Sequence, residues 1–301
     1  MQARRTTPAA QRGVVTSSRR SPHADAERPT LDASPPTRRA RTAPLVLCYH
    51  AVSATWEHEL SVPPEALHNQ LARLIQSGYT PATAAEAARG GGELLHVTFD
   101  DAYRSVLLAL PVLEELEVHA TLFVCSGLAD SGARLAVPEL AEQVARVPEE
   151  LETLPWDELR KLSERSVEIG SHTVTHPHLP TLPDDELEWE LVESKRRIEE
   201  EIGRPCRFLA YPYGDQDLRV REAARAAGYE GAFALPTGTE WGDRFQIGRI
   251  GVYRSDSRLW VAAKTSHFFR SRLGTRIVNM RTQRRVAAGG NAVIAPPLRS
   301  P

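Results

Sequence analysis

The chain has few cysteines and no long apolar run, and each shortage excludes a class of protein. Only three of its 301 residues are cysteine: Cys48, Cys125 and Cys206. This odd number at no metal-binding spacing, with two of the three inside apolar runs, predicts reduced core thiols rather than a disulfide framework. No stretch approaches the roughly 18 apolar residues that cross a bilayer. The basic N-terminus also lacks a secretory apolar core of about 7 to 15 residues, so we expect a cytoplasmic protein.

Charge is distributed unevenly along the chain, although the net charge is only -2. Residues 1–42 contain nine Arg and three acids, are rich in Ser, Thr, Pro and Ala, and show no apolar periodicity. Residues 264–301 contain eight Lys or Arg and no acid, which leaves residues 43–263 with a net charge of -16. We expect one acidic folded domain over 43–263, a disordered N-terminal tail and a basic C-terminal tail. Phe268 and Phe269 are too few aromatics for a stacking platform, so no nucleic-acid partner is expected.

Hydrophobic periodicity predicts that strands and helices alternate through the acidic domain. Apolar residues three to four positions apart predict helices at 64–77, 103–116 (interrupted by Pro111), 184–202 (ended by Gly203) and 218–227. Short apolar runs predict buried strands between them, including TLFV and GAFAL. Strand followed by helix, many times, predicts a parallel barrel or sheet.

Two polar clusters follow predicted strands. Asp100 and Asp101 come directly after one apolar run, and His172 and His176 follow another. Because parallel strands end at one edge of a sheet, and ligands bind beyond that edge, we expect both clusters to converge on one metal ion.

The residue types suit a catalytic metal. Two histidines and one aspartate match the three protein ligands of a catalytic zinc, which keeps a fourth position for water and lowers the pKa of that water to roughly 7. Cobalt, nickel or manganese accept the same geometry. The second aspartate is then free to take a proton from the water. A lone HxxxH or Asp pair is more often structural, so the prediction depends on their combination.

Three motifs extend this interpretation. The strings TFDD, SHTVTHP and YPYG resemble the leading motifs of the polysaccharide deacetylase or NodB-homology family, also called carbohydrate esterase family 4, in its YPYG-type branch. The resemblance covers roughly residues 43–260, including LVLCYHAVS at 45–53 and HATLFV at 119–124. It implies a single distorted (β/α) barrel that removes N- or O-acetyl groups from a sugar with a divalent metal, commonly zinc.

The resemblance also implies residue roles. Asp100 is the expected catalytic base, and Asp101, His172 and His176 are the expected metal ligands. The backbone N–H of Tyr213 is expected to help hold the tetrahedral oxyanion; without the other motifs, YPYG reads as an ordinary turn. The expected partner is a carbohydrate, an N-acetylhexosamine-containing sugar or polysaccharide precursor.

The sequence departs from the family pattern at two functional positions. Ala210 stands where many members carry an Arg that pairs with the base, and Arg249 is a candidate replacement or else a surface cation at a strand end. The late Leu-x-His motif that supplies a general acid is missing, and the setting of His267 does not resemble it. His50, after the first strand, is a candidate acid or else a packing residue beneath the site.

Two other functions therefore stay open. The first is that of a catalytically weakened carbohydrate-binding relative that keeps the fold and the metal. The second is that of a deacylase acting on another amide. Retention of both aspartates favours a sugar deacetylase, because a binding scaffold has no need of a base beside its metal ligand.

Overall fold

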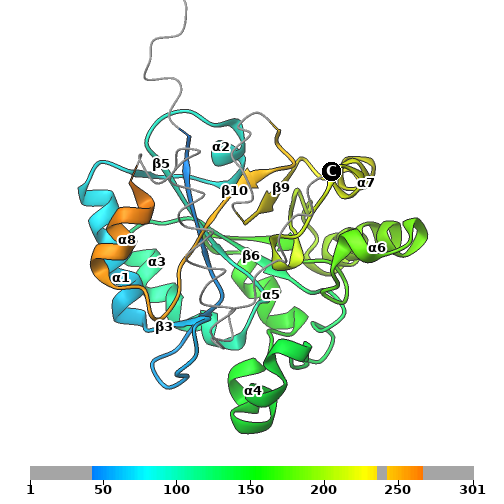
Figure 1. Cartoon of the computed structure of the whole chain (residues 1–301), viewed down its shortest axis with the longest axis horizontal. Helices are drawn as coiled ribbons and strands as arrows, with labels where there is room; N and C mark the ends of the chain where they lie inside the picture. The colour runs from blue at the N-terminus through cyan, green and yellow to red at the C-terminus, as the bar shows by residue number, and fades with distance from the viewer. Residues whose placement is uncertain (1–42, 236–242, 267–301) are drawn as a thin grey trace, which may run out of the picture. The chain divides into compact units, whose positions relative to one another are not determined.

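Parallel strands form a sheet that nearly closes into a barrel with helices outside it (Figure 1). The computed structural model describes residues 43–235 and 243–266, which all belong to one unit of the chain. Strands of the main sheet follow the order β10-β9-β8-β7-β6-β5-β1-β11, with β4 also paired to β5, and every pairing is parallel. The predicted distorted (β/α) barrel is confirmed.

The strands and helices have the following bounds. The strands of the main sheet are β1 (Leu45–Tyr49), β4 (Thr80–Pro81), β5 (Leu94–Phe99), β6 (Ala120–Val124), β7 (Val167–Ser171), β8 (Phe208–Ala210), β9 (Gly231–Ala234), β10 (Ile247–Gly248) and β11 (Ile250–Gly251). A separate pair joins β2 (Ala51–Val52) to β3 (Ser61–Val62). The α-helices are α1 (Pro64–Gln76), α2 (Ala84–Arg89), α3 (Leu110–Glu115), α4 (Ala141–Arg146), α5 (Trp156–Ser163), α6 (Asp184–Ile202), α7 (Leu218–Ala226) and α8 (Arg258–Thr265).

One short segment joins the two edges of the main sheet. Strand β10 pairs with β9 at one edge, and β11 pairs with β1 at the other. A single residue, Arg249, separates these two strands in sequence. The edges of the sheet therefore meet at Arg249, which lies on the seam of the barrel.

The predicted helices agree with the structure to within one residue, except near Pro111. A 3-10 helix (Arg104–Ala109) covers the first half of the predicted segment, and α3 begins at Leu110 with Pro111 in its first turn. The proline therefore starts an α-helix instead of interrupting one, because the first turn needs no backbone N–H donor from it.

The core explains why the strands read as continuous apolar runs. Every residue of β1, β6 and β9 is buried, as expected for parallel strands covered on both faces. The three cysteines are free and buried, as predicted.

The expected domain bounds, 43 and 263, stay a prediction. Helix α8 continues to Thr265, two residues past the expected limit at 263, and Lys264 is buried against Asp256. The predicted N-terminal tail over 1–42 lies outside the described residues, and so does the predicted C-terminal tail over 264–301 from His267 onward, with Phe268 and Phe269. Within the described residues, no helix is both long and apolar enough to cross a bilayer.

Candidate active site

The carboxyl ends of four strands of the sheet, β1, β5, β7 and β8, present the predicted polar residues. Asp100 follows β5, His50 follows β1, and β1 lies beside β5 in the sheet. His172 follows β7, and Tyr213 lies in the turn after β8. The structure therefore brings the two clusters together at one end of the barrel, as the sequence predicted.

Asp101, His172 and His176 form a buried cluster. Each offers one ligand atom, and these atoms all lie within 4.8 Å of one another. The Oδ1 atom of Asp101 is 3.5 Å from Nε2 of His172 and 3.4 Å from Nε2 of His176. Among the described residues, Oδ1 of Asp101 is buried without a hydrogen-bond partner. An unpartnered buried carboxylate oxygen facing two imidazole nitrogens fits a divalent cation.

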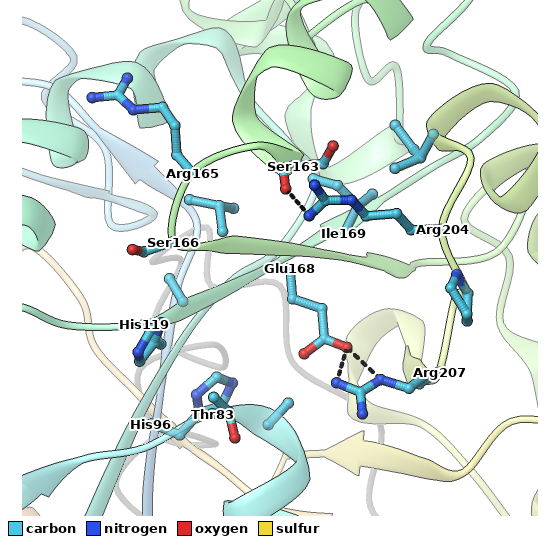
Figure 2. A pocket seen from close by; sticks show the side chains of 15 residues that line it. Thr83, His96, His119, Ser163, Arg165, Ser166, Glu168, Ile169, Arg204 and Arg207 are labelled. Atoms are coloured by element: carbon cyan, nitrogen blue, oxygen red, sulfur yellow. Dashed lines mark hydrogen bonds and ion pairs between the residues drawn. The ribbon is translucent and has the colours of Figure 1, made fainter.

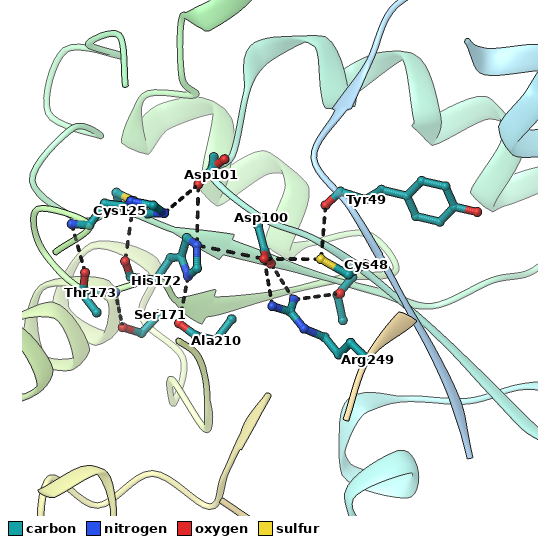
Figure 3. A network of polar contacts seen from close by, with 12 residues as sticks. Cys48, Tyr49, Asp100, Asp101, Cys125, Ser171, His172, Thr173, Ala210 and Arg249 are labelled. Atoms are coloured by element: carbon teal, nitrogen blue, oxygen red, sulfur yellow. Dashed lines mark hydrogen bonds and ion pairs between the residues drawn. The ribbon is translucent and has the colours of Figure 1, made fainter. Parts of the chain in front are cut away.

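The protonation behaviour of these three side chains also favours a bound divalent cation, because a nearby positive charge would stabilise the buried Asp101 carboxylate. Burial, and secondly the Asp100 carboxylate, raise the pKa of Asp101 to about 8. Burial also lowers the pKa of both His172 and His176, so both imidazoles are neutral, the form that binds metals. Nδ1 of His172 lies 2.8 Å from the carbonyl oxygen of Ala210 and donates to it, which turns Nε2 toward Asp101 (Figure 3).

Arg249 binds Asp100, the expected base, through both terminal nitrogens of its guanidinium group. One terminal nitrogen is 2.6 Å from Oδ1 of Asp100 and the other is 2.8 Å from Oδ2. Arg249 is 1% exposed, so its interpretation as a surface cation is wrong. Burial raises the pKa of the Asp100 carboxyl, but the charge and hydrogen bonds of Arg249, together with the nearby His172 and His50, outweigh burial and hold that pKa well below its usual range. Asp100 is therefore ionised and fixed in orientation.

Two further side chains lie beside Asp100. The thiol of Cys48 is 3.4 Å from Oδ2 of Asp100 and donates to it (Figure 3). His50, Cys48 and Asp100 each have a polar atom within 4.8 Å of the others. Burial lowers the pKa of His50 to about 4, and its Nδ1 is buried without a hydrogen-bond partner among the described residues. An unsatisfied buried nitrogen is a costly feature for a residue that only packs.

Tyr213 is held between two histidines. Its ring centroid is 4.6 Å from that of His176 and 3.9 Å from that of His178, which stacks on it at 10°. His178 also lies 3.4 Å from Asp215. The backbone of Tyr213 has a φ of 59°, which sets the turn that carries its N–H.

Backbone strain concentrates at this end of the barrel. Among the described residues, six non-glycine residues have positive φ, and five of them belong to the site motifs: Asp101, Ala102, Thr173, His176 and Tyr213. Left-handed backbone costs a non-glycine residue roughly 1 to 2 kcal/mol, so each of these positions must be held by its surroundings. Ala102 occupies such a position, where glycine fits without that cost.

A cavity opens at the opposite, amino ends of β6, β7 and β8 (Figure 2). Glu168 and Arg207 pair across it at 3.0 Å, and Arg204 donates to the carbonyl of Ser163. It includes none of the predicted site residues.

Sequence reasoning missed Cys48 and Glu190 near the site. Cys48 was interpreted as a core thiol, which its burial supports, but its contact with Asp100 joins residues 52 positions apart. Glu190 lies on α6 and accepts hydrogen bonds from the segment between the two histidines. A helix of charged residues gives no signal that one of its carboxylates is buried.

Comparisons with known proteins agree with this geometry. A family model described as polysaccharide deacetylase matches residues 87–232. A Bacillus subtilis protein named as a polysaccharide deacetylase, YxkH, is 22% identical over 193 residues, and the match covers 62% of this chain and 62% of that protein. The chain thus spans under two thirds of that relative.

Solved structures share the fold. The Streptococcus pyogenes deacetylase PplD, solved with acetate, has a TM-score of 0.62 at 19% identity, covering 75% of this chain and 99% of that one. IcaB from Ammonifex degensii has a TM-score of 0.61 at 26% identity, covering 74% of this chain and 97% of that one. With TFDD, SHTVTHP and YPYG converging on one site, these matches show that residues 87–232 are similar to the polysaccharide deacetylase family and that the described chain shares the fold of PplD and IcaB.

Proposed function

We propose that this protein is a metal-dependent deacetylase that removes N-acetyl or O-acetyl groups from a carbohydrate, with an N-acetylhexosamine-containing sugar or polysaccharide precursor as substrate. One observation carries the proposal. The ligand atoms of Asp101, His172 and His176 lie within 4.8 Å of one another. Beside them, Asp100 is an ionised carboxylate that forms an ion pair with Arg249. This arrangement combines a cation site with a separate base.

Asp101, His172 and His176 would hold the metal. Two imidazoles and one carboxylate favour zinc, and cobalt, nickel or manganese suit the same ligands. When bound, such an ion acidifies a water molecule and polarises the acyl oxygen. Since Asp101 supplies the negative charge and the histidines stay neutral, the ion keeps a net positive charge for that chemistry.

The other site residues move protons and hold charge. Asp100 takes a proton from the attacking water, and Arg249 keeps its carboxylate aimed during the transfer. The backbone N–H of Tyr213 donates to the tetrahedral oxyanion, a contact typically worth about 2.7 to 4 kcal/mol of barrier. As the carbon–nitrogen bond breaks, the proton that Asp100 took from water passes through His50 to the leaving amine, so that acetate and a free amino sugar result. His50 is suited to this relay because its ring lies within 4.8 Å of the Asp100 carboxylate.

Arg249 also weakens the case for a carbohydrate-binding relative without turnover. That alternative rested partly on Ala210, which stands where many members carry the arginine that orients the base. Here the same contact with Asp100 comes from a different strand. A chain that had lost catalysis would gain nothing from a buried arginine aimed at the base, because desolvating such a pair is costly.

The test is acetate release by purified protein loaded with zinc. The substrates are N-acetylglucosamine oligomers and nucleotide-linked N-acetyl sugars, each with and without chelator. We expect acetate release that stops with chelator and returns when zinc is added back. Asp100→Asn should lower the rate about 100-fold to 10,000-fold while retaining zinc, because it removes the base and leaves the ligands.

Asp157→Asn, on the exposed side of α5, is the matched control and should leave the rate unchanged. Acetate release that persists with chelator or in Asp100→Asn would contradict the assigned roles. Bound zinc and bound sugar without any acetate would favour the binding relative, and release of a different acid from another amide would favour the broader deacylase.

A further inference from the structure

The segment that carries both metal-binding histidines is fastened to α6 by a buried carboxylate. Glu190 is 4% exposed. One of its oxygens accepts hydrogen bonds from the backbone N–H of Val174 at 2.7 Å and from that of Thr175 at 3.0 Å. The other oxygen accepts a short hydrogen bond from the hydroxyl of Thr175. Both oxygens of Glu190 therefore accept hydrogen bonds from Val174 or Thr175, two of the three residues between His172 and His176.

A serine one helical turn later holds the start of the same segment. Ser194 is fully buried and donates to the carbonyl oxygen of Thr173 at 2.9 Å. Its oxygen lies 2.8 Å from the hydroxyl of Ser171, whose oxygen accepts from the N–H of Thr173 at 3.1 Å. Since the Ser194 proton goes to Thr173, the Ser171 hydroxyl donates to Ser194. Residues four apart on a helix share a face, so Glu190 and Ser194 act on the segment together.

This segment needs such support because its backbone is strained. Thr173 has a φ of 69° and His176 a φ of 65°, both in the left-handed region. The hydroxyl of Thr173 accepts from the N–H of His176 at 3.1 Å, which closes the turn from inside. Residues with such backbone angles return to ordinary angles unless hydrogen bonds hold them. Relaxation of either Thr173 or His176 would turn an imidazole away from Asp101.

We propose that Glu190 and Ser194 are positioning residues for the metal centre. They fix the turn from His172 to His176, so that both Nε2 atoms face Asp101 before any ion arrives. The inference deepens the proposed function and rests on it, because it assumes that Asp101, His172 and His176 bind a metal. Supporting residues of this kind typically change metal affinity 10-fold to 100-fold when removed.

A purely stabilising role for Glu190 predicts something different. The hydrogen bonds would then hold α6 against the sheet, and their loss would lower the unfolding temperature without changing the metal centre of the folded protein. Metal affinity and the geometry around the ion therefore separate the two roles, provided that they are measured well below the unfolding temperature.

The test measures zinc affinity of the full chain by competition with a chromogenic chelator, and the visible absorption spectrum of the cobalt-loaded protein. Glu190→Ala should weaken zinc binding 10-fold to 100-fold and alter the cobalt spectrum, because the turn is no longer held. Glu190→Gln keeps one oxygen for the two N–H donors and should lose less. Ser194→Ala, which removes one hydroxyl, should also have a smaller effect. Glu188→Ala, at an exposed position on the same helix, is the control and should match the wild type.

The possible outcomes separate this inference from the proposed function. Unchanged zinc affinity and cobalt spectrum in Glu190→Ala would overturn the inference alone. If Glu190→Ala does not fold, Glu190→Gln and Ser194→Ala decide by the same two measurements. A wild type that binds zinc but releases no acetate would overturn the proposed activity and leave the positioning role to be judged by affinity. A wild type that binds no zinc would overturn both.

Discussion

At the scale of single residues, the pair formed by Arg249 and Asp100 is the contact on which the proposed chemistry depends. The side chains are 0% and 5% exposed, and their charged atoms approach to 2.6 Å. Taking two charges out of water costs several kcal/mol per ion, which the pair recovers only through its two parallel hydrogen bonds. Removing one partner leaves the other charged and buried.

Arg249→Met is therefore expected to destabilise the fold by about 3 to 5 kcal/mol, since the Asp100 carboxylate loses its counter-charge. Urea unfolding of the metal-free protein measures this change. The double variant Arg249→Met with Asp100→Asn should recover much of the loss, because no buried charge remains. A single variant as stable as the wild type, or a double variant no better than the single one, would show that the pair does not carry this energy.

The sequence allowed the positions of the proposed site residues to be predicted better than the contacts that support them. Asp100, Asp101, His172 and His176 could be proposed because each pair follows a strand whose apolar run is readable. Arg249 was proposed as one of two alternatives, and its contact with Asp100 spans 149 positions. Glu190 and Cys48 were missed, because nothing local distinguishes a buried carboxylate on a charged helix or a thiol that donates to a base. Such contacts exist only once the barrel brings distant strands together.

At the scale of elements, α6 shows which boundaries a sequence specifies. Its last residue, Ile202, is followed by Gly203 with a φ of 70°, the left-handed cap predicted from the glycine. Helices with a strong apolar stripe were predicted to within one residue. In contrast, α4 and the short strands β10 and β11 have two to six residues each and no readable period. Their structure comes from packing and long-range pairing, which local sequence does not report.

The cap of α6 yields a direct test. Gly203→Ala should destabilise the fold by about 1 to 2 kcal/mol, because the Cβ of alanine makes the left-handed backbone conformation unfavourable. A Cβ at this position meets nothing within 4 Å, so the cost comes from the backbone and not from a clash. Gly203→Asn should cost less, since asparagine tolerates this conformation.

Chemical denaturation measures both variants of Gly203. Gly248→Ala is the control, because a Cβ there also meets open space while its φ is not in the left-handed region. Equal losses in Gly203→Ala and Gly248→Ala would mean that the cap conformation is not the cause.

At the scale of the whole molecule, closure of the barrel and placement of the base are one event. The segment from β10 to β11 joins both edges of the sheet, and its central residue is Arg249. Asp100 ends a strand inside the sheet, so the arginine reaches it only when the seam is formed. The fold therefore couples completion of the barrel to orientation of the proposed base.

Stability of the whole barrel should also depend on pH through His96, which lies in β5 and lines the cavity opposite the site (Figure 2). Its Nδ1 donates to the carbonyl of Ala82 at 2.8 Å, and its Nε2 accepts from the hydroxyl of Thr121 at 3.0 Å. Burial lowers the pKa of His96 from 6.5 to about 4. Between these two values the unfolded chain binds a proton that the folded chain excludes, so stability is lost as the pH falls from about 6.5 to 4.

His96→Asn tests this dependence, because an amide can keep a donor and an acceptor without titrating in that range. Unfolding free energies of wild type and variant should be compared at intervals from pH 8 to pH 4. The variant is expected to be less stable by a constant amount above pH 7, where His96 is neutral in both states. Below about pH 6.5 its stability should fall less steeply, by up to about 1.4 kcal/mol per pH unit. Parallel curves for the two proteins across the whole range would show that His96 takes up its proton equally well in the folded barrel.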